Sequence, residues 1–80
     1  MDPDGVREIA KKWRHLAKGL EDAAAAQDRA LSGVVWEGKA AKAFHKRSKA
    51  ARKSATDMAH ALRKGAKALD DFADKAHEML

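Results

Sequence analysis

The side chains of this chain that could take part in catalysis or metal binding are a few histidines, serines and carboxylates. No histidine stands three or four residues from another, the spacing that brings two metal ligands together on one helix; the histidines are His15, His45, His60 and His77. Neither Ser48 nor Ser54 has a nearby Asp and His that would activate its hydroxyl as a nucleophile. Cys is absent, which excludes disulfides and thiolate zinc sites. We therefore predict a protein that is not an enzyme, with no catalytic residue, metal, cofactor or small-molecule substrate.

Residues 37–53 form the one strongly charged segment. This basic segment has a single acid, Glu37, and seven bases, which are Lys39, Lys42, Lys46, Arg47, Lys49, Arg52 and Lys53. Residues 1–36 carry six acids against six bases, and residues 54–80 carry five acids against four bases. The excess that gives the chain its net charge of +5 therefore lies entirely in the basic segment.

Two interpretations of the basic segment stay open. Clustered Lys and Arg release counterions when they neutralise phosphates, so the alternative function is a basic helical nucleic-acid-binding protein that uses Lys39 to Lys53. Against this alternative, Phe44 belongs to an apolar stripe and leaves no exposed aromatic among the bases for stacking on nucleotides. Three-four spacing instead favours a solvated helix face, or a surface for an acidic partner, made by Lys42, Lys46, Lys49 and Lys53.

Long helices must carry these residues, because helix breakers are few and strand signals are missing. The one proline, Pro3, follows Asp2 at a good helix start, and no segment alternates apolar and polar residues with the period of a strand. Ser32-Gly33 supplies residues that commonly end a helix. We predict one all-α domain over residues 1–80, with helices over 4–32 and 39–80 and a turn over 33–38. No stretch approaches the roughly 20 apolar residues that span a bilayer, so we predict no membrane insertion.

Each predicted helix carries an apolar stripe with alternating steps of three and four residues, the spacing of a coiled-coil seam. The first stripe runs through Val6, Ile9, Trp13, Leu16, Leu20, Ala23, Gln27, Ala30 and Val34. The second runs through Ala41, Phe44, Ser48, Ala51, Ala55, Met58, Leu62, Gly65, Leu69, Phe72, Ala76 and Met79. The short connection between the helices predicts that they fold back as an antiparallel hairpin with these stripes as its seam.

Such a hairpin would bury little apolar area by itself. Much of the seam is Ala, Ser and Gly, and at about 25 cal/mol per Å² a seam of this kind struggles against chain entropy. With the reversal centred near Trp36, the second helix from Leu69 onward would have no helix beside it. We therefore expect dimerisation into a four-helix bundle, in which the second hairpin is reached by Trp13, Leu16, Leu20, Phe44, Met58, Leu62, Leu69 and Phe72.

The residues at the reversal resemble a known signature. Trp36-Glu37-Gly38 lies between two long amphipathic helices and continues as Lys39-Ala40-Ala41-Lys42-Ala43-Phe44. This run, Trp-x-Gly-x-Ala-Ala-x-Ala-Phe, resembles the WXG family of type VII secretion substrates, and the resemblance covers nearly the whole chain. It implies an antiparallel hairpin that pairs with itself or with a second WXG-like hairpin and is recognised by the type VII secretion machinery.

The resemblance also implies a location. Family members leave the cytoplasm by the type VII route without a cleavable signal peptide, and here the start MDPDGVREIAKKW has no signal-peptide pattern. Family substrates or their partners usually carry a Tyr-x-x-x-Asp/Glu export motif after the second helix, and this chain has no Tyr. We expect the motif to come from a partner or from a following segment, with the chain acting as the amino-terminal targeting domain of an actinobacterial toxin. Any toxin activity would then lie elsewhere.

Two roles for Trp36 remain open. Its large ring would fill the closed end of the hairpin, while Gly38 would allow the turn and the alanines after it would let the second helix start close to the first. The resemblance adds a role of Trp36 in recognition by a partner or a secretion component. The leading hypothesis is a protein that works by pairing, and a purely structural coiled-coil module is a further alternative.

Overall fold

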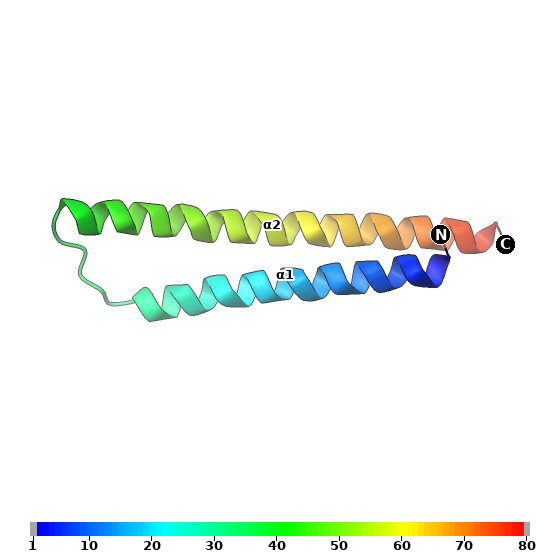
Figure 1. Cartoon of the computed structure of the whole chain (residues 1–80), viewed down its shortest axis with the longest axis horizontal. Coiled ribbons are helices and arrows are strands. Elements are labelled where there is room, and N and C mark those ends of the chain that lie inside the picture. The colour runs from blue at the N-terminus through cyan, green and yellow to red at the C-terminus, as the bar shows by residue number, and fades with distance from the viewer. Residues whose placement is uncertain (1, 80) are drawn as a thin grey trace.

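The chain forms two long antiparallel helices joined by a short connection (Figure 1). Helix α1 spans Pro3–Leu31 and helix α2 spans Lys39–Glu78 in a computed structural model that describes residues 2–79. The predicted all-α hairpin is confirmed, and the described helix ends lie within two residues of the predicted ones. The predicted last helical residue, Leu80, lies outside the described residues. Within residues 2–79, neither helix is apolar enough over a sufficient length to cross a membrane.

Local sequence explains where both helices begin. Asp2 caps α1, because its carboxylate accepts a hydrogen bond of 3.0 Å from the backbone N–H of Asp4, and Pro3 occupies the first turn, where a missing N–H costs nothing. At the reversal, Gly33 and Gly38 have φ of 82° and 84°, a region that side chains with a Cβ rarely adopt. These glycines let the chain leave α1 and enter α2.

The helices meet along a line of small side chains, which we name the inner seam. It consists of the residues Val6, Ala10, Ala17 and Ala24 of α1 and Ser48, Ala59, Ala66 and Ala73 of α2, all of them buried. The largest fully buried side chain is that of Val6. Because the distance between packed helices depends on the side chains at the contact, a seam of alanines lets α1 and α2 approach closely.

The predicted seam is half wrong. Its positions at Val6 and Ser48 are buried, but other predicted seam residues are exposed, among them Leu16, Ala23, Ala30, Phe44, Met58 and Phe72. The chain instead buries the residues one step further along, which are Ala10, Ala17 and Ala24 in α1 and Ala59 and Ala73 in α2. Most heptads carry three apolar or small positions, while a two-helix contact buries only two of them. Close approach through alanine decides which two are buried.

The predicted overhang of α2 from Leu69 onward is also wrong. Arg7 forms an ion pair of 2.9 Å with Asp74, so α1 runs beside the carboxyl-terminal part of α2. Helix α2 extends past α1 at both ends, and at the closed end it begins beyond the end of α1 (Figure 1). The connection over residues 32–38 is extended rather than tight, which moves the start of α2 outward. The result is a rod with extents of 63 × 16 × 13 Å.

Candidate protein-binding surface

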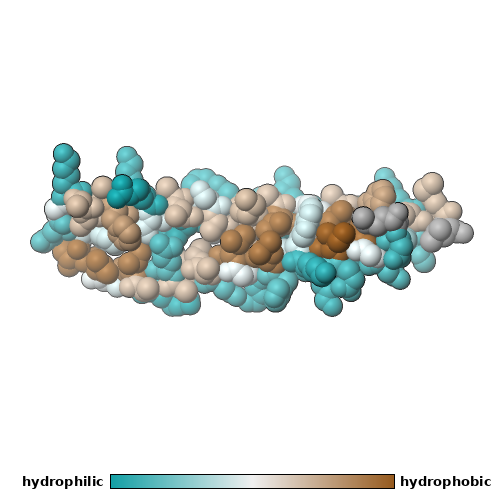
Figure 2. Space-filling view, in the orientation of Figure 1, coloured by the Kyte–Doolittle hydropathy of each residue, from teal (hydrophilic) through white to brown (hydrophobic). Residues whose placement is uncertain are grey.

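Large apolar side chains gather on one side of the rod, which we name the apolar face. Its exposed members are between 37% and 57% accessible, and they are Trp13 and Leu16 of α1 and Phe44, Met58 and Phe72 of α2. Half-buried Ile9 completes it on α1. Figure 2 shows hydrophobic atoms along much of the line where the two helices meet, with hydrophilic atoms at the margins.

Helix geometry explains why these residues share one side. Leu16 directly precedes the seam residue Ala17, and Met58 and Phe72 directly precede the seam residues Ala59 and Ala73. One residue turns a helix by about 100°. In an antiparallel pair, the same step toward the amino terminus leads to the same side of the hairpin from both helices. The apolar face therefore combines side chains from α1 and α2 over most of the length of the rod.

Trp13 closes the groove between the helices on this face by lying over Gly65. A Cβ added to Gly65 would sit 2.7 Å from Cζ3 and 3.1 Å from Cε3 of the Trp13 ring. Real Cβ atoms essentially never approach another heavy atom to 2.7 Å, so the ring position requires glycine. The absence of a side chain at Gly65 thus leaves space for the Trp13 ring, and Trp13 stays 37% exposed.

The Trp-x-Gly residues lie at the closed end. Trp36 is half-buried in the connection and packs on the first turns of α2, with its ring centroid 5.7 Å from that of Phe44 and 4.6 Å from that of His45. Glu37 is exposed, and Gly38 directly precedes α2. The predicted packing of Trp36 at the closed end is thus observed as partial burial against Phe44, which links the signature to the apolar face.

Ion pairs line the side of the hairpin opposite the apolar face, and we name this side the ion-pair flank. Arg14 lies 2.5 Å from Asp70, Glu21 lies 2.5 Å from Arg63, and Asp28 pairs with Arg52. With the Arg7–Asp74 pair, the α1 members follow a seven-residue spacing. The hydrogen bond from Arg63 lowers the pKa of the Glu21 carboxyl, and the bond to Asp74 raises the pKa of the Arg7 guanidinium. The flank neutralises its own charges within one chain.

A polar pair lies near the closed end of the inner seam. The Gln27 side-chain amide donates a hydrogen bond of 2.9 Å to Oγ of Ser48, which is buried. In helical seams a matched polar pair fixes the register, because a shifted alignment leaves its members unpaired. Gln27, which interrupts the apolar stripe in the sequence, therefore has a structural partner.

The seven bases of the basic segment are exposed except for Arg52, which is half-buried beside Asp28. Lys53 pairs with Asp57 on its own helix at 2.8 Å. Among residues 2–79, no carboxylate pairs with the other five bases of the segment, Lys39, Lys42, Lys46, Arg47 and Lys49. Lys42, Lys46, Lys49 and Lys53 are all exposed, as predicted for a solvated helix face.

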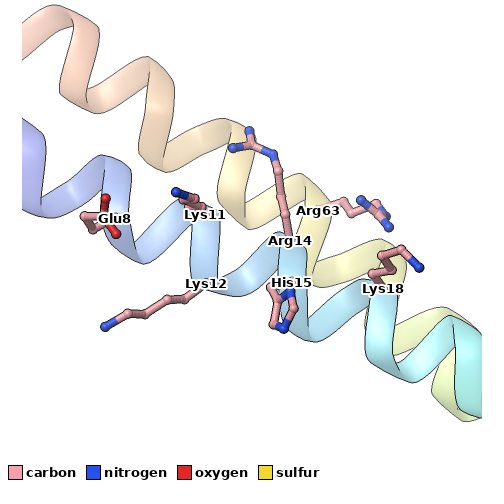
Figure 3. A pocket seen from close by; sticks show the side chains of 7 residues that line it. All are labelled: Glu8, Lys11, Lys12, Arg14, His15, Lys18 and Arg63. Carbon is pink, nitrogen blue, oxygen red and sulfur yellow. The ribbon is translucent and has the colours of Figure 1, made fainter.

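A shallow trough lies on the outer side of α1. It is lined by Glu8, Lys11, Lys12, Arg14, His15, Lys18 and Arg63. Figure 3 shows these side chains pointing in different directions rather than toward a common point. Arg14, Lys18 and Arg63 are already engaged by carboxylates. In the part of the chain that the structure describes, no group of three or more His, Asp or Glu side chains could hold a metal ion.

The structure separates the predicted interface residues into two sets. Trp13, Leu16, Phe44, Met58 and Phe72 are exposed on the apolar face, whereas Leu20, Leu62 and Leu69 are half-buried between the helices. The sequence-based reasoning missed the Gln27–Ser48 bond and the ion-pair flank. The signal for the flank was present, because basic positions 7 and 14 and acidic positions 21 and 28 repeat every seven residues along α1.

No protein-family model matches this chain, and neither a curated protein nor a solved structure matches it. The resemblance to the WXG family therefore rests on Trp36-Glu37-Gly38 and the residues around it.

Proposed function

We propose that this protein works by pairing, with the apolar face docked against a second helical hairpin to give a four-helix bundle. The observation that carries the proposal is the exposure of Trp13, Leu16, Phe44, Met58 and Phe72 on one face while alanines fill the inner seam. Contiguous apolar surface on a soluble chain marks an interaction site, and a hairpin lying across this face would remove it from water.

The energetics of the isolated hairpin support a partner. Burial contributes about 25 cal/mol per Å² of apolar surface, and an alanine offers little surface to bury. The side chains with the largest apolar area stay half in water. At 80 residues and without Cys, the chain has no disulfide to offset its chain entropy. Docking through the apolar face would supply the burial that the inner seam lacks.

The resemblance to the WXG family gives this pairing its proposed setting. We propose that the hairpin is a type VII secretion-associated substrate or targeting domain, exported without a cleavable signal peptide, with any toxin activity in another part of the protein. Trp36 contacts Phe44, a member of the apolar face, so the signature and the pairing surface adjoin at the closed end. The proposed role is recognition rather than catalysis.

Pairing can be tested by the mass of the chain in solution, measured by light scattering over a range of concentrations, alone and with candidate partner hairpins. Met58→Glu should abolish any pairing, because it places a charge in the middle of the apolar face. His60→Glu is the matched control, since His60 is also exposed on α2 but follows the seam residue Ala59 and faces the other side. Equal loss in both variants would argue against the apolar face.

Export can be tested with the tagged chain in a bacterium that has a type VII machine. We expect Trp36→Ala to lower the exported fraction while the helical content stays unchanged. Val35→Ala is the control, because Val35 is the neighbouring side chain and is largely exposed. Normal export of the Trp36 variant would contradict a recognition role and leave Trp36 with packing alone.

Nucleic-acid binding is the second candidate, and the five unpaired bases of the basic segment favour it. If they bind phosphates, the chain should be retained on DNA, and log affinity should fall linearly with log salt with a slope of about −0.9 per phosphate neutralised. Lys46→Glu and Lys49→Glu together should then remove retention. Lack of retention at low salt would reject this candidate.

A further inference from the structure

The margins of the apolar face carry charges of one sign. The outer edge of the apolar face is formed on each helix by positions spaced seven residues apart, the positions of Lys12 on α1 and of Arg47 and Lys75 on α2, and we name it the edge row. On α1 it contains Gly5, Lys12, Gly19 and Ala26, and on α2 it contains Ala40, Arg47, Ser54, Ala61, Ala68 and Lys75. Its three charged members are all cations, and each stands three residues after Ile9, Phe44 or Phe72. None of them takes part in an ion pair among residues 2–79.

The acids closest to the edge row are largely engaged already. They lie one row further out, where Asp22, Asp57 and Asp71 pair with Lys18, Lys53 and Lys67, each four residues earlier on the same helix. Glu8 and Glu78 lie on this row near the open end. The ion-pair flank offers no charge either, because it is neutralised internally and lies on the opposite side. The charged side chains at the border of the apolar face itself are therefore all cations, and the nearest acids, among them Glu8 four residues before Lys12, lie one row further out.

Two copies of this chain would bring these cations together. Because Arg7 pairs with Asp74 and Arg14 pairs with Asp70, Lys12 is level with the α2 residues near Asp71, about one helical turn from Lys75. If two copies docked in opposite directions, the edges of α2 that carry Arg47 and Lys75 would face each other. If they docked in the same direction, Lys12 of one copy would lie beside the edge that carries Lys75 of the other. Both two-fold arrangements oppose like charges.

We infer that the natural occupant of the apolar face is a helical hairpin with acidic residues along its own margins, and not a second copy of this chain. The inference rests on the proposed pairing function. Anions placed opposite Lys12, Arg47 and Lys75 would neutralise the edge row, fix the direction of docking and select this partner over self-association. Other positions of the edge row have small side chains, so the partner's helices can approach closely; they include Gly19, Ala26, Ala61 and Ala68.

The test uses an acidic mate made from the chain itself. The variant that combines Lys12→Glu, Arg47→Glu and Lys75→Glu keeps the apolar face and reverses its edge row. Dissociation constants for the wild type alone, the variant alone and their mixture are measured by sedimentation at low and high salt, with circular dichroism to verify helical content. The mixture should pair about tenfold more tightly than either component at low salt, and the difference should vanish near 1 M salt, where the screening length is about 3 Å.

The control reverses three unpaired cations away from the edge row, through Lys39→Glu, Lys46→Glu and Lys49→Glu. This variant has the same net charge as the acidic mate, so an equal gain in its mixture with the wild type would overturn the inference and leave only overall charge. Wild-type self-pairing as tight as the mixture would overturn it as well. No pairing in any mixture, even at high salt, would instead reject the proposed pairing function itself.

Discussion

The inner seam and the apolar face run side by side along the same two helices but are built from different residues. The seam consists mostly of alanines at 0% to 7% accessibility, whereas the face presents Trp, Leu, Phe and Met side chains to water. A hairpin that was stabilised as a monomer alone would bury its large apolar residues and expose its small ones. The difference indicates that intrachain packing uses close approach of the backbones, while the large side chains remain available to a partner.

The largest expected effect on stability comes from enlarging an alanine of the inner seam. Ala66→Leu should destabilise the hairpin by about 1–3 kcal/mol, because the added methylene and methyl groups have no space between the helices. Ala68→Leu, two residues further on the exposed surface, should change stability by less than about 0.5 kcal/mol. Urea unfolding followed by circular dichroism measures both. Similar effects of the two substitutions would mean that the seam is not tightly packed.

Two glycine substitutions test whether the Trp13 ring is held in place over Gly65. Gly19→Ala should stabilise α1 by about 0.5–1 kcal/mol, because nothing lies within 4 Å of the added Cβ and alanine favours the helix. Gly65→Ala has the same helical gain but must displace the Trp13 ring, so it should be neutral or destabilising. Thermal unfolding gives the energies, and fluorescence in a Trp36→Phe background reports the movement of Trp13. An equal gain at both glycines would show that the ring moves freely.

The polar pair in the seam gives a smaller effect. Ser48→Ala should cost about 1 kcal/mol, because it leaves the half-buried amide of Gln27 without its acceptor. Combining it with Gln27→Leu should recover most of the loss. A double-mutant cycle from urea unfolding isolates the coupling between these two side chains. Strictly additive energies would show that the hydrogen bond does not stabilise the register.

The smallest expected effect concerns pH at the ion-pair flank. The pKa of Glu21 is lowered from its ordinary value of 4.5 by the hydrogen bond from Arg63. A carboxyl with a lowered folded-state pKa stabilises the fold fully above about pH 4.5, and this contribution is lost as the pH falls through the folded-state pKa. Melting temperatures of the wild type and Glu21→Gln should therefore differ at pH 6 and converge at lower pH. A constant difference would exclude this linkage.

Much of the fold follows from local sequence signals. Asp2 and Pro3 mark the start of α1, Gly33 and Gly38 mark the reversal, and the long runs without breakers give the helices. The exposed members of the candidate site can also be predicted from the sequence, because the large residues on an alanine-rich hairpin exceed what two helices can bury. Two contacts could not be predicted from the sequence, because both depend on the alignment of the two helices. They are the hydrogen bond between Gln27 and Ser48 and the packing of Trp13 on Gly65.

The sequence by itself determined that two amphipathic helices fold back on each other, because three-four spacing and turn glycines act over short distances along the chain. It did not determine which apolar positions are buried. Ile9 and Ala10, or Met58 and Ala59, fit overlapping stripes with the same spacing. Only the tertiary structure decided between them, because the choice depends on how closely two backbones approach and on which charges then meet across the helices, as Arg7 meets Asp74.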